Sequence, residues 1–199
     1  MNRSTTIHFV RHGKVHNPQE LYYGRLPSFH LSSEGLLHVK RAADYLGKYE
    51  IAALYSSPLE RATETAKIIS EQLGIESQTS ELLLEAFSPF DGQSISDLNK
   101  RNWDVYTGTE PPYEQPIDIL TRAKTFSWQI RSRFPGKNII AVTHGDLIAF
   151  MVLWAKQLSI TPQEKRKLYE SFLTYASISS FTYETNVETE IPKFEYFQP

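Results

Sequence analysis

Two histidines, each followed by a glycine, are the residues of this sequence best placed to do chemistry. His12 lies in Arg11-His12-Gly13, where the apolar run 7–10 ends, and His144-Gly145 directly follows the apolar run 139–143. Residues just past the carboxyl ends of strands form the ligand crevice of an open α/β sheet. If both runs are strands, the two histidines are expected to lie at one site.

The residues around these histidines indicate an anion-binding site. A neutral imidazole can attack phosphorus near neutral pH and form a phosphohistidine. Arg11 and Arg61 carry guanidinium groups that bind phosphate oxygens in a bidentate way. His144 precedes an expected helix, so its ring and the nearby backbone amides can face the same anion. We therefore predict phosphoryl transfer with His12 as the nucleophile.

A leaving group also needs a proton, which a carboxylic acid commonly supplies. Glu85 follows the apolar run 82–84, where partial burial and a bound dianion would raise its pKa toward the acid form. Glu81 precedes that run and is expected to face solvent, whereas Asp146 is expected to cap the helix that it begins. Glu85 is thus the predicted proton donor, with Glu81 and Asp146 as alternatives.

Composition restricts the other classes of function. The 199-residue chain has a net charge of -2 and no cysteine, so it offers no basic surface for nucleic acid and no thiolate nucleophile. No apolar run approaches the ~20 residues of a membrane helix, and the N-terminus lacks the apolar core of a signal peptide. We expect a cytoplasmic protein that binds neither nucleic acid nor membrane, and the oligomeric state is left open.

Metal and nucleotide cofactors find no support in the motifs. Close-spaced ligand patterns such as HExxH, a Walker A loop and Gly-x-Gly-x-x-Gly are all absent. Two arginines beside His12 and His144 would also oppose a bound cation. The expected partner is a small phosphorylated molecule, without metal or cofactor.

Apolar spacing predicts the elements that must position these residues. Strand and helix patterns alternate along the chain, which is typical of a largely parallel sheet covered on both faces. We predict an α/β fold, a three-layer α/β/α sandwich with a mostly parallel central sheet, as a single domain over residues 1–199. Helices are expected at 36–46 (capped by Ser32 or Ser33), 58–73 (capped by Ser57), 117–134, 146–157 and 162–172, and strands at 7–10, 53–56, 75–79, 139–143 and 177–184.

Two segments fall outside this alternation. Residues 86–116, called the lid segment below, contain four prolines and the aromatics Phe87, Phe90, Trp103, Tyr106 and Tyr113. A loop of this length inside a compact domain is usually functional or disordered. The aromatics favour a packed segment over disorder, and we interpret it as a lid. The alternative is that these aromatics simply cover the edge of the sheet. The C-terminal segment 191–197 could pair with a partner chain or lie along its own domain.

At these residues the chain resembles the histidine phosphatase superfamily, also called the phosphoglycerate mutase-like family. Arg11-His12-Gly13 matches the Arg-His-Gly signature of the family, and Thr143-His144-Gly145 matches its second-histidine motif. The Ser-Pro-Leu-x-Arg-Ala motif corresponds to residues 57–62, and the segment 23–35 resembles the stretch that leads into the first helix of the family. The three motifs occur in the family's order, and the resemblance covers most of the chain.

The resemblance implies roles for individual residues. His12 would be the phosphorylated nucleophile, and Arg11, Arg61 and His144 would form the phosphate pocket. Asn17 and Gly24 would add phosphate contacts. Glu85, followed by Phe90-Asp91-Gly92, resembles the family's acid-containing segment.

Phosphatases and mutases of this superfamily share the pocket, so the lid segment has to distinguish them. A mutase must retain a charged phosphoglycerate and is expected to line its cap with cations. The lid segment offers only Lys100 and Arg101, against Asp91, Asp97, Asp104 and Glu110. We therefore predict hydrolysis of a phosphomonoester; the alternatives are a mutase-type phosphotransferase and a non-catalytic module that binds phosphorylated ligands.

Overall fold

A six-stranded sheet organises residues 4–199, which are the residues described by this computed structural model. The strand order is β3-β2-β4-β1-β5-β6. The first four of these run parallel, whereas β5 is antiparallel to both β1 and β6. The predicted α/β fold with a mostly parallel sheet is confirmed. The strands are β1 Thr5–Arg11, β2 Ile51–Ser56, β3 Ser77–Thr79, β4 Asn138–Thr143, β5 Ile178–Tyr183 and β6 Lys193–Phe197.

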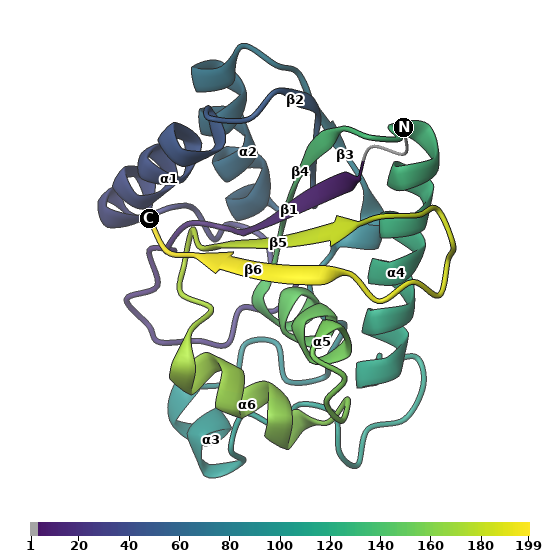
Figure 1. The fold of residues 1–199 in the computed structure, drawn as a ribbon. Coiled ribbons are helices and arrows are strands. Elements are labelled where there is room, and N and C mark those ends of the chain that lie inside the picture. Colours follow the sequence, from purple (N-terminus) through teal and green to yellow (C-terminus); the bar gives the residue numbers. More distant parts are fainter. Residues whose placement is uncertain (1–3) are drawn as a thin grey trace.

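Helices cover both faces of the sheet (Figure 1). Helices α1 (Ser33–Leu46) and α2 (Glu60–Leu73) pack on one face, and α4 (Pro116–Arg133) and α5 (Gly145–Ala155) pack on the other. The short helix α3 (Ile95–Lys100) and α6 (Pro162–Ser171) lie together beyond the sheet, at the bottom of the view in Figure 1. The three-layer arrangement follows from the sequence, because alternate residues of β1 and β4 face opposite helix layers.

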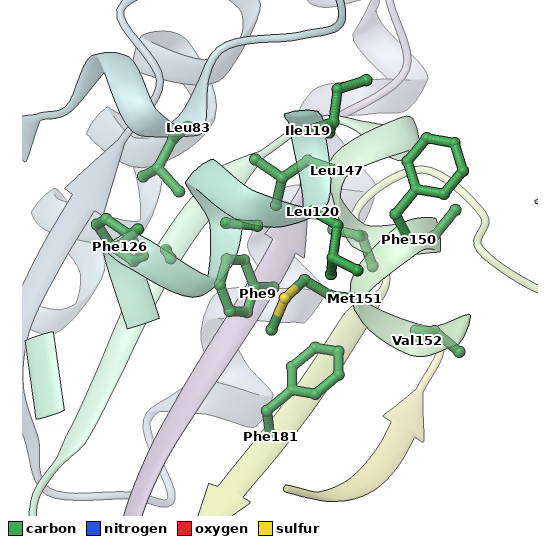
Figure 2. Close-up of a cluster of buried hydrophobic side chains, with 14 of the residues drawn as sticks. Phe9, Leu83, Ile119, Leu120, Phe126, Leu147, Phe150, Met151, Val152 and Phe181 are labelled. Atoms are coloured by element: carbon green, nitrogen blue, oxygen red, sulfur yellow. The ribbon is translucent and has the colours of Figure 1, made fainter. Parts of the chain in front are cut away.

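The larger of the two cores lies between the sheet and the α4/α5 layer. Phe9 of β1 makes edge-on contacts with Phe126 of α4 and Phe181 of β5, at ring-centroid distances of 6.0 and 5.5 Å. Figure 2 shows Met151 of α5 beside Phe9 in this cluster. Residues 147–153 of α5 are all buried, so this helix is apolar on every side and requires cover from both the sheet and its neighbouring helices.

The start of α2 differs from the prediction. Ser57 was expected to cap this helix with Pro58 in its first turn, but α2 begins at Glu60 and its cap, Leu59, has no side-chain cap bond. The backbone N–H of Ser57 instead donates to the carbonyl of Val142, which extends the β2–β4 pairing. The Ser57 hydroxyl is thereby placed at the carboxyl edge of the sheet, beside His144.

Two further expectations are corrected at element ends. Asp146 does not cap α5, because the cap is His144 and the Asp146 carboxylate is held by other side chains. The third strand begins at Ser77 and not at residue 75, since the N–H of Ile75 donates to the carbonyl of Ser70 and completes the turn after α2. Gly74, with φ of +67°, ends that helix as predicted.

The lid segment is ordered around α3, a helix that the prolines and glycines of this stretch concealed. Its Leu98, Val105 and Tyr106 are buried in the larger core, so the aromatic and apolar residues pack as expected. The C-terminal segment pairs with β5 of its own chain as β6, and Phe197 stacks on Tyr45 at 3.6 Å between ring centroids. That residues 86–116 act as a lid, and that residues 1–199 form a single domain, stay predictions. No helix in the described part of the chain is both long and apolar enough to cross a membrane.

Candidate active site

His12 lies at the carboxyl end of β1 with its ring in a defined orientation. The backbone N–H of His12 donates to the carbonyl of Thr143, which extends the β1–β4 pairing by one residue. Its Nδ1 lies 2.8 Å from the carbonyl oxygen of Gly13. A carbonyl can only accept, so Nδ1 carries the proton and Nε2 carries the lone pair. The side chain is 1% exposed, and the unprotonated nitrogen therefore lies inside the protein.

Gly13 is required for this orientation. A Cβ at Gly13 would lie 2.8 Å from Cγ2 of Val39 and 3.0 Å from the carbonyl oxygen of Gly35, in the tightly packed start of α1. The N–H of Gly13 donates to the hydroxyl of Thr65 on α2. The turn after β1 is thus fixed by both helices of one layer.

Arg61 projects from the first turn of α2 toward His12. Its Nε donates to Nε2 of His12 at 3.3 Å, and its Nη2 donates to the carbonyl of Gly24 at 2.6 Å. Arg11 reaches the same cavity as His12 from the end of β1 and donates to the carbonyl of Leu173. Burial and these two cations hold the pKa of His12 well below its usual range, which keeps the imidazole neutral.

His144 lies next to His12, with 5.2 Å between the ring centroids. Its Nε2 is 2.7 Å from the hydroxyl of Ser57. Nδ1 of His144 is buried and has no hydrogen-bond partner among residues 4–199. Burial and the positive charge of Arg61 lower the pKa of His144 well below its usual range. If Ser57 donates to Nε2, the proton of the neutral ring lies on Nδ1, on the side where Glu85 is found.

Glu85 joins the two histidines at the carboxyl edge of the sheet. Its Oε2 lies 4.0 Å from Nδ1 of His144, and its Oε1 accepts from the N–H of Ala86 at 2.8 Å. Burial, followed by the negative charge of Asp146, raises the pKa of Glu85 to about 7. Glu81, the alternative acid, is exposed as expected. The geometry favours Glu85 as the group that exchanges a proton near neutral pH.

Asp146, the other alternative acid, is engaged in a buried polar cluster. Its Oδ2 accepts from Nζ of Lys165 at 2.8 Å and from the Tyr106 hydroxyl, and its Oδ1 accepts from the Tyr169 hydroxyl at 2.8 Å. Although burial opposes it, the charge of Lys165 lowers the pKa of Asp146. Asp146 is therefore held as the carboxylate and is poorly suited to donate a proton.

Two residues carried over from the resemblance lie at the same cavity. The side-chain amide of Asn17 is bonded on both sides to the backbone of Leu21, with Nδ2 donating to the carbonyl at 2.8 Å and Oδ1 accepting from the N–H at 3.1 Å. Gly24 has φ of +35°, and a Cβ there would lie 1.8 Å from Oδ1 of Asp91. Asn17 shapes the loop after β1, and Gly24 supplies the carbonyl that holds Arg61.

Sequence reasoning missed an ion cluster that supports the backbone of Glu85. Arg25 and Arg122 both donate to the carbonyl oxygen of Glu85, at 2.8 and 3.2 Å. Both also pair with Glu114 of the lid segment, at 2.8 Å for Arg25 and 2.6 Å for Arg122. Arg25 lies 89 positions from Glu114, and none of the three residues belongs to a motif, so no local signal could have identified the cluster.

The site opens into a cavity of about 500 Å³. Beyond the residues already described, two tyrosines that sequence analysis did not single out lie beside His12, Tyr23 at 6.2 Å and Tyr175 at 5.7 Å between ring centroids. The outer wall comes from the loop after β1, the lid segment and α6. It includes Glu20, Leu21, Tyr22, Ile95, Trp103, Val105, Lys165, Arg166, Tyr169 and Glu170.

Known proteins share both this sequence pattern and this fold. A family model described as the histidine phosphatase superfamily (branch 1) matches residues 7–190. The chain is 34% identical over 168 residues to the uncharacterized protein Rv0525 of Mycobacterium tuberculosis, with 81% of each chain covered. It is 26% identical to putative phosphoserine phosphatase 2 of Hydrogenobacter thermophilus, covering 73% of this chain and 76% of that one.

Solved structures show the same fold at lower identity. Mycobacterial glucosyl-3-phosphoglycerate phosphatase Rv2419c aligns with a TM-score of 0.78 and 21% identity, covering 98% of this chain and 97% of that one. Phosphoserine phosphatase from Entamoeba histolytica, in complex with 3-phosphoglyceric acid, aligns with a TM-score of 0.74 and 21% identity, covering 96% of both chains.

Proposed function

Because the chain belongs to the histidine phosphatase superfamily (branch 1) and is an enzyme of the histidine phosphatase type, we propose that it hydrolyses a small phosphomonoester through a phosphohistidine on His12. The observation that carries this proposal is the orientation of His12. Its Nδ1 is held on the carbonyl of Gly13 and its Nε2 faces Arg61, so a neutral nucleophile and a phosphate-binding cation lie side by side.

In the first step, the Nε2 lone pair of His12 forms a bond to phosphorus while the bond from phosphorus to the leaving oxygen breaks. Glu85 gives its proton to that oxygen and becomes a carboxylate. Arg11 and Arg61 stabilise the charge on the remaining phosphoryl oxygens. His144 adds a donor through Nδ1, which has no protein partner among the described residues. The second N–H of the Asn17 amide, besides the one bonded to Leu21, and the backbone N–H of Gly24 complete the phosphate pocket.

In the second step, water attacks phosphorus and the bond between phosphorus and Nε2 of His12 breaks. The Glu85 carboxylate takes the proton from the water, which restores the starting enzyme and releases inorganic phosphate. A pKa of about 7 for Glu85 suits both roles, since the group can donate in one step and accept in the next. Each step uses side chains of this chain and requires no metal ion.

The charges on the cavity wall favour hydrolysis over mutase chemistry. Apart from Arg11, the cations that reach the cavity from outside the lid segment each have a carboxylate partner. Lys14 is paired with Glu34. On α6, Lys165 is paired with Asp146 and Arg166 with Glu170, each at 2.8 Å. Lys100, one of the two lid cations counted in the sequence, is paired with Asp97 and does not line the cavity. These pairings leave little positive charge to retain a phosphoglycerate carboxylate between two transfer steps.

The proposal is tested by measuring release of inorganic phosphate from an aryl phosphate, without added metal and in the presence of a chelator. We expect turnover by the wild type, none by His12→Ala, and reduced turnover by Glu85→Gln, with a stronger reduction when an alkyl phosphate replaces the aryl phosphate. Full activity in His12→Ala would refute the nucleophile. A wild type that does not hydrolyse the aryl phosphate but transfers a phosphoryl group from 2,3-bisphosphoglycerate to phosphoglycerate would favour the mutase. Phosphate binding with neither activity would favour a binding module.

A further inference from the structure

Tyr23 and Tyr175 meet above the nucleophile from opposite ends of the chain. Their hydroxyl oxygens lie 3.3 Å apart. Tyr23 belongs to the loop after β1 and Tyr175 to the turn before β5, and both line the cavity together with His12. Both side chains are partly exposed whereas His12 is buried. The paired tyrosines therefore form part of the cavity wall beside His12.

Each ring also lies against one of the arginines assigned to the phosphate pocket. The guanidinium carbon of Arg61 is 4.7 Å from the Tyr23 ring centroid, and that of Arg11 is 4.1 Å from the Tyr175 ring centroid. These cation–π contacts fix each tyrosine relative to an arginine. Each hydroxyl is thus carried by a ring that packs against an arginine next to His12.

The backbone around Tyr175 is strained in a way that fixes this position. Leu173 and Ala176, on either side of it, have φ of +66° and +58°, a region that non-glycine residues rarely adopt and that carries a conformational penalty. Two bonds to the site maintain the turn, from Arg11 to the carbonyl of Leu173 and from the N–H of Ala176 to the carbonyl of His12. The strained turn is therefore built onto the phosphate pocket itself.

We propose that the hydroxyls of Tyr23 and Tyr175 are phosphoryl ligands, which donate hydrogen bonds to the oxygens of the group transferred to His12. This inference rests on the proposed function and adds two residues to its phosphate pocket. Binding exchanges one neutral bond between the hydroxyls for two bonds to an anion, and bonds to charged acceptors are the stronger kind. Burial and the neighbouring Tyr175 raise the pKa of Tyr23, so its hydroxyl keeps the proton that it has to donate.

The test compares binding of inorganic phosphate, measured by calorimetry, in Tyr23→Phe and Tyr175→Phe with that of the wild type. Phenylalanine keeps each ring and its cation–π contact and removes only the donor. Tyr45 and Tyr49 of the α1 region provide a matched control, because their hydroxyls also lie 3.1 Å apart but on the exposed surface. We expect about tenfold weaker phosphate binding for each cavity variant, and unchanged binding for Tyr45→Phe.

Turnover of an aryl phosphate is measured in parallel, so that the two proposals can fail separately. If the wild type turns over and both cavity variants bind phosphate as tightly as the wild type, the tyrosine assignment is wrong and the proposed function stands. Tighter binding or faster turnover in the variants would likewise overturn it, and indicate a barrier to entry. If the wild type binds phosphate without turnover, the proposed function fails, and the binding constants of the variants alone decide the tyrosine assignment.

Discussion

The distribution of protons among the buried residues supports the proposed roles of His12 and Glu85. Burial and the two arginines lower the pKa values of His12 and His144, whereas burial and Asp146 raise the pKa of Glu85 to about 7. At neutral pH the proton available for transfer is therefore carried by Glu85, and the imidazoles stay neutral. Groups whose pKa values are pushed apart in this way can act as acid and nucleophile in one reaction.

This assignment predicts the pH dependence of turnover. Because the protonated form of Glu85 donates to the leaving group, kcat for an alkyl phosphate is expected to fall as the pH rises through about 7. Glu85→Gln should remove that alkaline limb and lower kcat by ~10²- to 10⁴-fold. The loss should be smaller for an aryl phosphate with an acidic leaving group. An unchanged alkaline limb in Glu85→Gln would assign the titration to another group.

Asp146→Asn tests the cause of the raised pKa. Removing this negative charge leaves Lys165 unneutralised, and both changes favour the Glu85 carboxylate, so the alkaline limb is expected to move to lower pH. The shift is read from the kcat profile of the variant against that of the wild type. A limb that stays in place or moves to higher pH would contradict the electrostatic account of Glu85.

Ser57 is expected to set the tautomer of His144. Its hydroxyl lies 2.7 Å from Nε2, and removing it leaves that nitrogen without a donor. Ser57→Ala is predicted to lower kcat by about five- to tenfold, which corresponds to one neutral hydrogen bond, with a smaller change in KM. Ser132→Ala, at an exposed position of α4, serves as the control, and equal kcat values in both variants would remove Ser57 from the account.

At the scale of elements, one carboxylate ties the lid segment to the site. Glu114 pairs with Arg25 from the loop after β1 and with Arg122 from α4, and both arginines hold the carbonyl of Glu85. The N–H of Phe87 also donates to Glu114. The backbone on either side of Glu85, the proposed proton donor, is therefore positioned by a single ion cluster that joins three segments.

Glu114→Gln is predicted to destabilise the protein and slow turnover together, because two partly buried arginines lose their counter-charge. The expected loss is about 2–4 kcal/mol in the free energy of unfolding, measured by chemical denaturation, with a lower kcat at 25 °C. Glu110→Gln removes an exposed carboxylate from the same segment and should change neither quantity. If Glu114→Gln behaves like that control, the cluster does not position Glu85.

At the scale of the whole molecule, three buried histidines make stability depend on pH. Burial lowers the pKa of His8 to about 4, and the pKa values of His12 and His144 also lie well below the usual value of 6.5. The unfolded chain therefore binds more protons than the native state below that value, and their contribution to stability is lost as the pH falls. Glu85, with a raised pKa, acts in the opposite sense between its usual value of 4.5 and about 7.

The three buried histidines are expected to dominate between pH 6.5 and 5, where their lowered pKa values oppose that of Glu85. The free energy of unfolding should decrease as the pH is lowered from about 6.5 toward 5, by up to ~1.4 kcal/mol per pH unit for each histidine. His8 lies outside the cavity, so His8→Asn should reduce that slope without changing kcat. Denaturation curves at a series of pH values, recorded for the wild type and this variant, measure the slope. Stability that is constant or increases toward pH 5 would mean that the buried histidines are protonated in the native state.

The spacing of apolar residues along the sequence predicted most of the fold. The alternation of apolar runs and helical spacing identified the sheet, five helices and the positions of His12, Arg61 and His144 at its carboxyl edge. What it could not identify depends on contacts between distant segments. Ser57 was assigned as a cap because the sequence does not reveal its bond to His144, and Tyr175 lies 152 positions from the hydroxyl that it meets.

Trapping the enzyme during turnover tests directly whether His12 becomes phosphorylated. The enzyme is mixed with excess phosphomonoester, quenched in alkali within the first turnover, digested and analysed by mass spectrometry. We expect one added phosphoryl group, stable in alkali and lost in acid, on the peptide that contains His12. We expect none in His12→Ala. A pre-steady-state burst of product with an unmodified His12, or with the phosphoryl group on another residue, would contradict it.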